Sequence, residues 1–315
     1  MSRGDYAGVM PVAPATFADR LHAHGPGSAA ASLAEAEAFC RAVAAGHREN
    51  FPIGLRLLPE RLRQPMVNVY AFCRWADDLG DEPDDAAESL RLLAWWRVET
   101  AACFAGEPSH PITIALAKTA ADFDLSEQPF QHLISAFKQD QTVAAYDTLP
   151  QLLEYATRSA DPVGRVVLRL CGADTPHNIA LSDRVCTGLQ LINFWQDVSR
   201  DAEIGRRYLP ADRMAAHGYT DAMWQSRRTN EHLRSLGREL VADAELRLQA
   251  GNELAAGLRG RMRAVVACFH RAGLLVAGRI RCGGFDLWRR PAVSRRDLGG
   301  VAARSVLVAA AGRRR

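Results

Sequence analysis

The 315-residue sequence predicts an all-α protein, because apolar residues recur at helical spacing along most of the chain and strand patterns are nearly absent. An Ala-rich segment that ends near Gly46 shows this spacing clearly. The chain has no alternation of strands and helices, no Gly-x-Gly-x-x-Gly segment and no P-loop, which argues against a nucleotide-binding α/β fold. We therefore expect one domain of many helices around a central cavity.

Start and stop signals divide the chain into these helices. Pro59 suits a first helical turn, and Asp84 and Asp85 make an acidic start for the next helix. The Gly283–Gly284 pair and Pro291 end the last helix. The predicted helices cover residues 31–46, 59–78, 84–104, 111–123, 127–137, 149–171, 176–201, 221–250 and 254–282.

The organisation follows from composition. Residues 1–30 are rich in Pro, Gly and Ala, lack a secretory signal, and are expected to be a loosely ordered lead-in. Residues 31–288 form the single domain, and residues 289–315 are an Arg-rich tail expected to be frayed. The most apolar stretch, Val301–Ala311, contains Arg304 and is shorter than the roughly 18 residues that a membrane span needs. Peripheral membrane contact remains open.

Composition also limits the function classes. The chain is 48% hydrophobic and 24% charged, as in a globular protein with a sizeable core, and its net charge is only +3. Basic residues are scattered among acids, so we expect no nucleic-acid partner. Seven widely spaced cysteines without a Cys-x-x-Cys pair argue against a disulfide framework and a zinc site, and indicate a reducing, cytoplasmic compartment.

Two polar stripes carry the chemistry. In the first, Tyr70 to Glu82, residues three or four apart place Tyr70, Arg74, Asp77 or Asp78, and Asp81 on one helical face. A pair of acids near a helix end is more often a solvated face than a metal site, and Pro83 suggests such an end.

The second stripe is more informative. Gln190, Asn193, Asp197 and Asp201 step along one face of a helix whose other faces are strongly apolar. Burying two carboxylates is costly, and the two would repel each other, unless a cation relieves both costs. Mg²⁺ prefers oxygen ligands and takes few of them from protein when phosphate oxygens complete its shell. Two such stripes across a cavity would hold a diphosphate between metal ions.

Three motifs of the chain resemble those of the squalene/phytoene synthase family, the head-to-head prenyltransferases. They are Arg-x-x-Asp-Asp-x-x-Asp from Arg74, Gln-x-x-Asn-x-x-x-Asp-x-x-x-Asp from Gln190, and Gly-Arg-x-Tyr-Leu-Pro after them. The resemblance covers about residues 36–282 and implies an isoprenoid-synthase-type helical bundle around a central active-site channel. Within the family, the segments Gly46–Pro59, Arg158–Arg165 and Asn193–Asp201 resemble the bacterial hopanoid-pathway hydroxysqualene (squalene) synthases.

The resemblance implies roles for individual residues. It places Mg²⁺ at Asp77, Asp81, Asn193, Asp197 and Asp201, with Asp78 and Glu82 as second choices. It implies that the substrate is bound by His47, Arg48, Asn50, Phe51, Gln190 and Gln196. Gln196 stands where some relatives have a phosphate-binding Arg, so its part in charge stabilisation is open. The implied catalytic residues are Tyr70, Arg74, Tyr155 and Tyr208.

The implied reaction ionises presqualene diphosphate in a dry, aromatic-lined cavity, for which Phe51, Phe72, Tyr155 and Phe194 are candidate walls. Capture by water would give hydroxysqualene, and the lack of a dinucleotide fingerprint mildly favours water over hydride. An alternative is the synthesis of squalene, presqualene diphosphate or phytoene from farnesyl or geranylgeranyl diphosphate. A class I terpene cyclase is a further alternative, ranked after these. A noncatalytic assembly factor would have eroded stripes, and these are intact. Hydroxysqualene synthesis would imply a functional link to other hopanoid-pathway enzymes.

Overall fold

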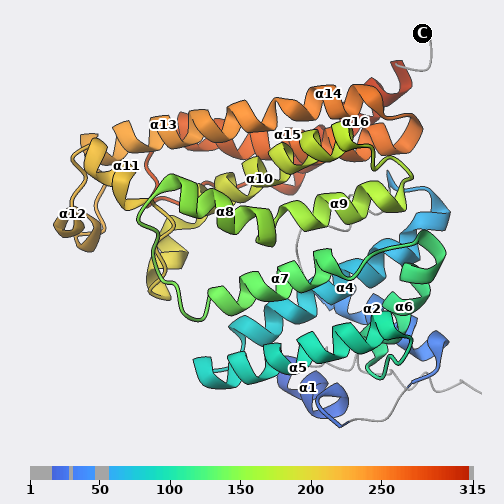
Figure 1. The fold of residues 1–315 in the computed structure, drawn as a ribbon. Helices are drawn as coiled ribbons and strands as arrows, with labels where there is room; N and C mark the ends of the chain where they lie inside the picture. Colours follow the sequence, from blue (N-terminus) through green and yellow to red (C-terminus); the bar gives the residue numbers. More distant parts are fainter. Residues whose placement is uncertain (1–15, 28–30, 47–56, 312–315) are drawn as a thin grey trace, which may run out of the picture.

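The computed structural model describes residues 16–27, 31–46 and 57–311, which form helices and connecting loops without a β-strand (Figure 1). The helices are α1 (Phe17–His24), α2 (Leu33–Gly46), α4 (Glu60–Asp81), α5 (Ala86–Ala105), α6 (Pro111–Phe123), α7 (Gln128–Gln139), α8 (Leu149–Ser159), α9 (Asp161–Leu170), α10 (Pro176–Glu203), α11 (Ala211–Ala216), α12 (Asp221–Gln225), α13 (Glu231–Leu248), α14 (Ala250–Gly257), α15 (Gly260–Cys282) and α16 (Arg295–Ala311). This confirms the predicted fold class.

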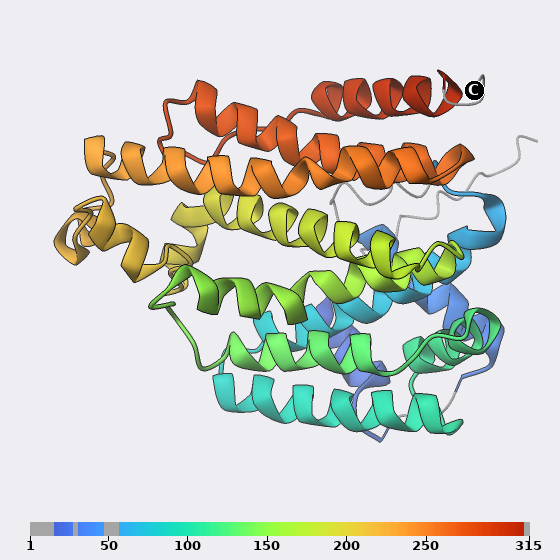
Figure 2. The ribbon, with the colours of Figure 1, turned by 45° about the horizontal axis from the view of Figure 1, so that its top comes forward.

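The buried residues form two cores. One centres on α4, α5 and α6, where Phe72, Trp75 and Trp96 are fully buried. The other centres on α10 and α13, where Trp195 and Leu236 are almost fully buried. Helices α8, α9 and α10 lie between the α4–α7 layer and the α13–α16 layer, as both views show (Figures 1 and 2). The two polar stripes belong to α4 and α10, which therefore bring one stripe from each core to the middle of the molecule.

Three predicted helices are broken where backbone chemistry interrupts them. The predicted 149–171 helix divides into α8 and α9 at Ala160, because Pro162 has no N–H to donate to the carbonyl four residues before it and its ring crowds that carbonyl. The predicted 221–250 helix divides into α12 and α13 near Arg227, whose φ is +50°. The predicted 254–282 helix divides into α14 and α15 at Gly260, whose φ of +58° suits glycine.

One described helix lies within each segment that composition marked as a lead-in or a tail. Within the lead-in, α1 packs the ring of Phe17 against Trp75, with 5.7 Å between ring centroids, and Arg20 pairs with Asp78 at 3.3 Å. Within the tail, α16 packs on α15, and Arg279 pairs with Asp297 at 2.8 Å. Both helices are thus held against the helical domain by contacts that composition does not reveal. No helix in the described ranges is long and apolar enough to cross a membrane.

Candidate active site

A cavity of about 330 Å³ lies between the two cores, a size typical of small-ligand sites. Its walls come from α4, α9, α10, α14 and α15 and are mainly aliphatic. Both polar stripes reach it, because Tyr70 from α4 and Gln190 and Asn193 from α10 line the cavity. The cavity therefore combines an apolar chamber with the beginning of each stripe.

The first stripe continues along α4 as a network of ion pairs. The Arg74 guanidinium contacts the Asp77 carboxylate at 2.8 Å and the Asp78 carboxylate at 2.6 Å. Asp78 is 1% exposed and is also reached by Arg20, so its position suits a structural ion pair more than a metal ligand. Asp81, the last residue of α4, is exposed, and its Oδ1 lies 3.1 Å from the Arg206 guanidinium. Glu82 is an exposed C-cap residue.

The second stripe continues along α10 in the same way. Asp197 pairs with Arg290, and the side-chain amide of Gln196 donates to the Pro291 carbonyl at 3.2 Å. Gln196 thus holds the segment that carries Arg290, a role that sequence reasoning did not suggest. One turn further, burial and the nearby Asp197 raise the pKa of Asp201 to about 7.

The acidic ends of the two stripes meet. Arg206 bonds to Asp81 from the first stripe, and the negative charges of Asp81 and Asp140 contribute to the raised pKa of Asp201 in the second. Helices α4 and α10 both end here, and helix C-termini add partial negative charge. Within the described ranges no three His, Cys, Asp or Glu side chains gather as a ready-made metal cluster. One or two carboxylates per ion nevertheless suit Mg²⁺ when phosphate supplies other ligands.

A buried aromatic layer lies beside this acidic end. The hydroxyls of Tyr155 and Tyr208 donate to the two oxygens of Asp140 at 2.7 and 3.4 Å. Burial raises the pKa of Asp140 to about 6 and raises the pKa of both hydroxyls, which remain donors. The ring of Tyr208 stacks on Phe194 with centroids 3.9 Å apart. Sequence reasoning missed Asp140, which stands alone at the end of α7 without a recognisable spacing.

The cavity walls differ from the expected aromatic lining. Phe72 is fully buried against Trp96 and Phe130 in a core, and neither Tyr155 nor Phe194 lines the cavity. The aromatic residues that line it, among those described, are Tyr70 and Phe269. The aromatic side chains of Phe72, Tyr155 and Phe194 instead pack against other residues of the two cores. His47, Arg48, Asn50 and Phe51 lie outside the described residues.

A buried carboxyl that the sequence did not single out adjoins the cavity. Asp161 begins α9 between the cavity-lining residues Ala160 and Val163, and it is 4% exposed. The Thr187 hydroxyl donates to Asp161 Oδ1 at 2.9 Å, which joins α9 to α10. Burial raises the pKa of Asp161 to about 7.

Asp161→Asn is expected to make folding stability less dependent on pH. The folded-state pKa of Asp161 is raised, so its protonated form contributes stability that is fully present below the unfolded pKa and is lost as pH rises through about 7. Asn keeps the acceptor for Thr187 without the charge. Between about pH 5 and about pH 8, the wild type should lose about 2 kcal/mol more unfolding free energy than the variant, measured by urea denaturation. Equal losses in both proteins would contradict the assignment, and the exposed Asp84→Asn serves as the control.

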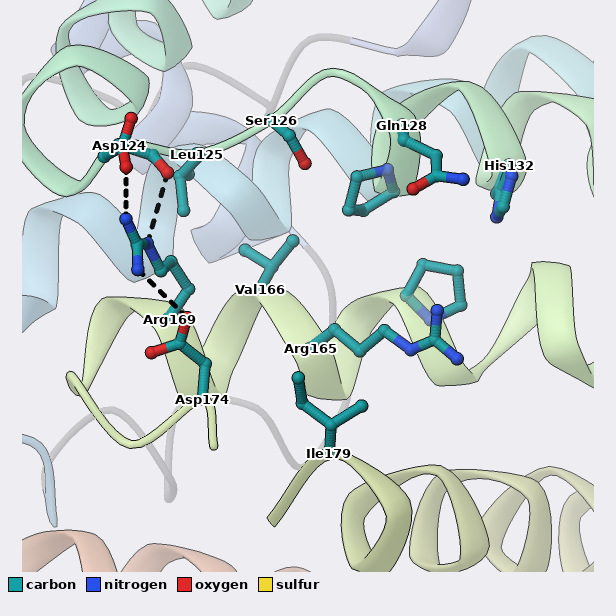
Figure 3. A pocket seen from close by; sticks show the side chains of 12 residues that line it. Asp124, Leu125, Ser126, Gln128, His132, Arg165, Val166, Arg169, Asp174 and Ile179 are labelled. Carbon is teal, nitrogen blue, oxygen red and sulfur yellow. Dashed lines mark hydrogen bonds and ion pairs between the residues drawn. The ribbon is translucent and has the colours of Figure 1, made fainter. Parts of the chain in front are cut away.

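A second cavity, of about 280 Å³, lies between α7, the loop before it, and α9 (Figure 3). Arg169 bonds there to Asp124 and Asp174, and Arg165 is paired with Asp183. Carboxylates pair with both arginines, and no residue of either polar stripe lines this cavity.

Comparison with known proteins agrees with this geometry. A family model described as squalene/phytoene synthase matches residues 44–297. The chain is 31% identical to a phytoene synthase of Arthrospira platensis over 66% of this chain and 72% of that protein. It is 32% identical to a presqualene diphosphate synthase of Rhodopseudomonas palustris over 54% of this chain and 61% of that protein.

A solved structure has the same fold over most of its length. The squalene synthase HpnC of Alicyclobacillus acidocaldarius superimposes with a TM-score of 0.77 at 34% identity, and the match covers 80% of this chain and 95% of that one. The family match spans both polar stripes, the cavity helices and the Gly205–Pro210 segment. The chain belongs to the squalene/phytoene synthase family.

Proposed function

We propose that this protein is a Mg²⁺-dependent hydroxysqualene synthase, which ionises presqualene diphosphate and captures the rearranged cation with water. The observation that carries the proposal is the meeting of two acidic stripes, joined by Arg206 and Asp81, beyond an apolar cavity that both stripes enter. This arrangement suits a substrate with a charged diphosphate and a long hydrocarbon chain. The similarity to a squalene synthase named HpnC supports the choice within the family.

The residues of the acidic end fit Mg²⁺. Asp81, Asp197 and Asp201 supply carboxylate oxygens at the ends of the two stripes, and the pKa of Asp201 is raised by burial and by neighbouring negative charge that a divalent cation would relieve. We assign the ion to these three residues, with Asp77 and Asn193 adjoining. When bound, Mg²⁺ supplies Lewis-acid stabilisation of the departing diphosphate.

The chain's own residues bind and position the substrate. Arg206 and Arg290, which hold Asp81 and Asp197, place positive charge where the diphosphate departs with the electron pair of its C–O bond. Tyr155 and Tyr208 hold Asp140 and thereby fix the aromatic layer behind that charge. The aliphatic walls exclude bulk water from the carbocation.

Water capture requires one water molecule to reach the cation. Its oxygen forms the new C–O bond, and the proton it loses passes to a base such as the released diphosphate. Gln190 and Asn193 are polar side chains in a mainly aliphatic cavity, and we assign them the positioning of this water. The product is a water-insoluble alcohol, so we place the enzyme in the cytoplasm at the membrane, beside enzymes of the hopanoid pathway.

A second candidate is synthesis of presqualene diphosphate or phytoene, which the sequence similarity to synthases of both products favours. Purified protein with Mg²⁺ and either presqualene diphosphate or farnesyl diphosphate separates the candidates by mass spectrometry of the lipid. We expect hydroxysqualene from presqualene diphosphate. Presqualene diphosphate formed from farnesyl diphosphate would favour the second candidate, and absence of a lipid product from either substrate would revive a noncatalytic function.

A further inference from the structure

The positive charge of this chain is concentrated in its last helices. After Glu253 the sequence contains fourteen arginines, two aspartates and neither glutamate nor lysine, a net charge of +12. The whole chain carries only +3, so residues 1–253 carry −9. The scatter of charges noted from the overall composition therefore hides a strong asymmetry, of the kind that accompanies binding to a polyanion or an anionic surface.

Much of this charge is not neutralised within the protein. Arg279, Arg281 and Arg290 pair with Asp297, Glu245 and Asp197. Other arginines in the described ranges donate hydrogen bonds to neutral groups instead. Arg261 donates to the Leu58 carbonyl at 3.2 Å, and Arg271 donates to the Ser305 hydroxyl at 3.5 Å. Arg263 donates to the backbone carbonyls of Ala255 and Ala256. Arg304 is exposed on α16.

The same region exposes apolar side chains. On α16, Val306 is 45% and Leu307 is 68% exposed, whereas Ser305 is fully buried against α15. A helix that packs on a protein in water normally buries its large aliphatic residues and exposes its polar ones. Val306 and Leu307 depart from this arrangement, whereas Leu298 and Val301 of the same helix are partly buried, so the outer face of α16 presents two exposed apolar side chains.

This surface adjoins the active-site cavity. Phe269 of α15 is 40% exposed and also lines the cavity, and Leu58, which accepts a hydrogen bond from Arg261, lines it as well. Phe269, Ala272 and Val276 share one face of α15 at helical spacing. Helix α16 packs on α15, and α16 (red) lies at the outer edge of the helical layers (Figure 2).

We propose that α15 and α16 form a docking surface for an anionic lipid bilayer, next to the apolar cavity. Arginines without carboxylate partners attract anionic headgroups, and Val306, Leu307 and Phe269 enter the interfacial region. A second copy fits less well, because two such surfaces repel each other. RNA also fits less well, because single-strand binding uses rows of exposed aromatic residues for stacking. The inference names a partner for the proposed function but rests on separate evidence, namely charge and exposure.

The test is flotation of the full-length protein, without substrate, with vesicles of phosphatidylcholine alone or of phosphatidylcholine mixed with phosphatidylglycerol. We expect binding to the mixed vesicles that weakens with added salt. Arg304→Gln should lower the affinity about fivefold, as expected for one arginine near an anionic surface. Leu307→Asp should lower it by about tenfold or more, because it removes an inserted apolar side chain and adds a repelled charge.

The matched control is Val98→Asp on α5, since Val98 is 67% exposed and lies in the other core's helices. Circular dichroism checks the fold of each variant. Equal binding to both kinds of vesicle would overturn the proposal. So would an equal loss of vesicle affinity in Val98→Asp and Leu307→Asp, or a dimer of the wild type that Leu307→Asp dissociates. Turnover of detergent-dispersed substrate distinguishes the two proposals: Leu307→Asp should keep it, and vesicle binding without any turnover would refute only the proposed function.

Discussion

Replacing Asp197 or Asp81 with Ala is expected to lower Mg²⁺-dependent diphosphate release by about a thousandfold, the scale of losing a group that stabilises transition-state charge. Each carboxylate lies at the meeting point of the stripes and pairs with an arginine. Both pairs are partly exposed, with side-chain exposures of 29% for Asp197 and 49% for Asp81. Such pairs contribute about 1 kcal/mol or less to stability, so the variants should remain folded.

The control for these variants is Asp84→Ala, which removes an exposed carboxylate three residues after Asp81. Diphosphate release is followed with a coupled phosphate assay at saturating Mg²⁺, and folding by circular dichroism. Full turnover in either Asp81→Ala or Asp197→Ala would contradict the proposed metal assignment. A comparable loss in Asp84→Ala would show that the effect is not specific to the stripes.

Arg74→Met is expected to destabilise the fold by about 3 kcal/mol, because it removes a charged partner of a buried carboxylate. Asp78 is 1% exposed and lies 2.6 Å from the Arg74 guanidinium, whereas Arg20 contacts it at 3.3 Å. The free energy of unfolding, measured by urea denaturation, tests this. Arg74→Lys should restore part of the loss, because an ammonium group keeps the charge but not the two-carboxylate geometry.

The matched control is Arg91→Met on α5, which removes an exposed pair with Glu88 and should cost less than about 1 kcal/mol. If Arg74→Met is as stable as the wild type but inactive, Arg74 acts only on the substrate, as the sequence resemblance implied. If it is unstable and Arg74→Lys is both stable and active, its main contribution is to hold Asp78 and the first stripe.

The helical class and the second stripe were predictable because they depend on local spacing. Gln190, Asn193, Asp197 and Asp201 lie on one helix whose Ile192, Phe194 and Trp195 are buried, as their pattern predicted, whereas Leu189 is partly buried. The first stripe was also placed correctly on one helix, which ends at Asp81 as Pro83 suggested. The predicted metal, substrate and catalytic roles of these residues stay predictions.

The partners of the stripes were not predictable, because they depend on contacts between distant segments. Arg290 reaches Asp197 from the tail that composition marked as frayed, and Arg20 reaches Asp78 from the lead-in. Asp140 meets Tyr208 where backbone bonds, among them one from Arg207 to Ala144, hold the segment after α10 beside the loop after α7. Single polar residues without a repeating spacing give no signal for such contacts.

The most direct test of the central claim is the conversion of presqualene diphosphate by the purified protein with Mg²⁺ in water labelled with a heavy oxygen isotope. The acidic meeting point of the stripes and the apolar cavity predict diphosphate release and a hydroxysqualene that carries one labelled oxygen. Release should stop when a chelator removes Mg²⁺ and resume when the ion is restored. Intact presqualene diphosphate after incubation, or a lipid product without the label, would contradict the account.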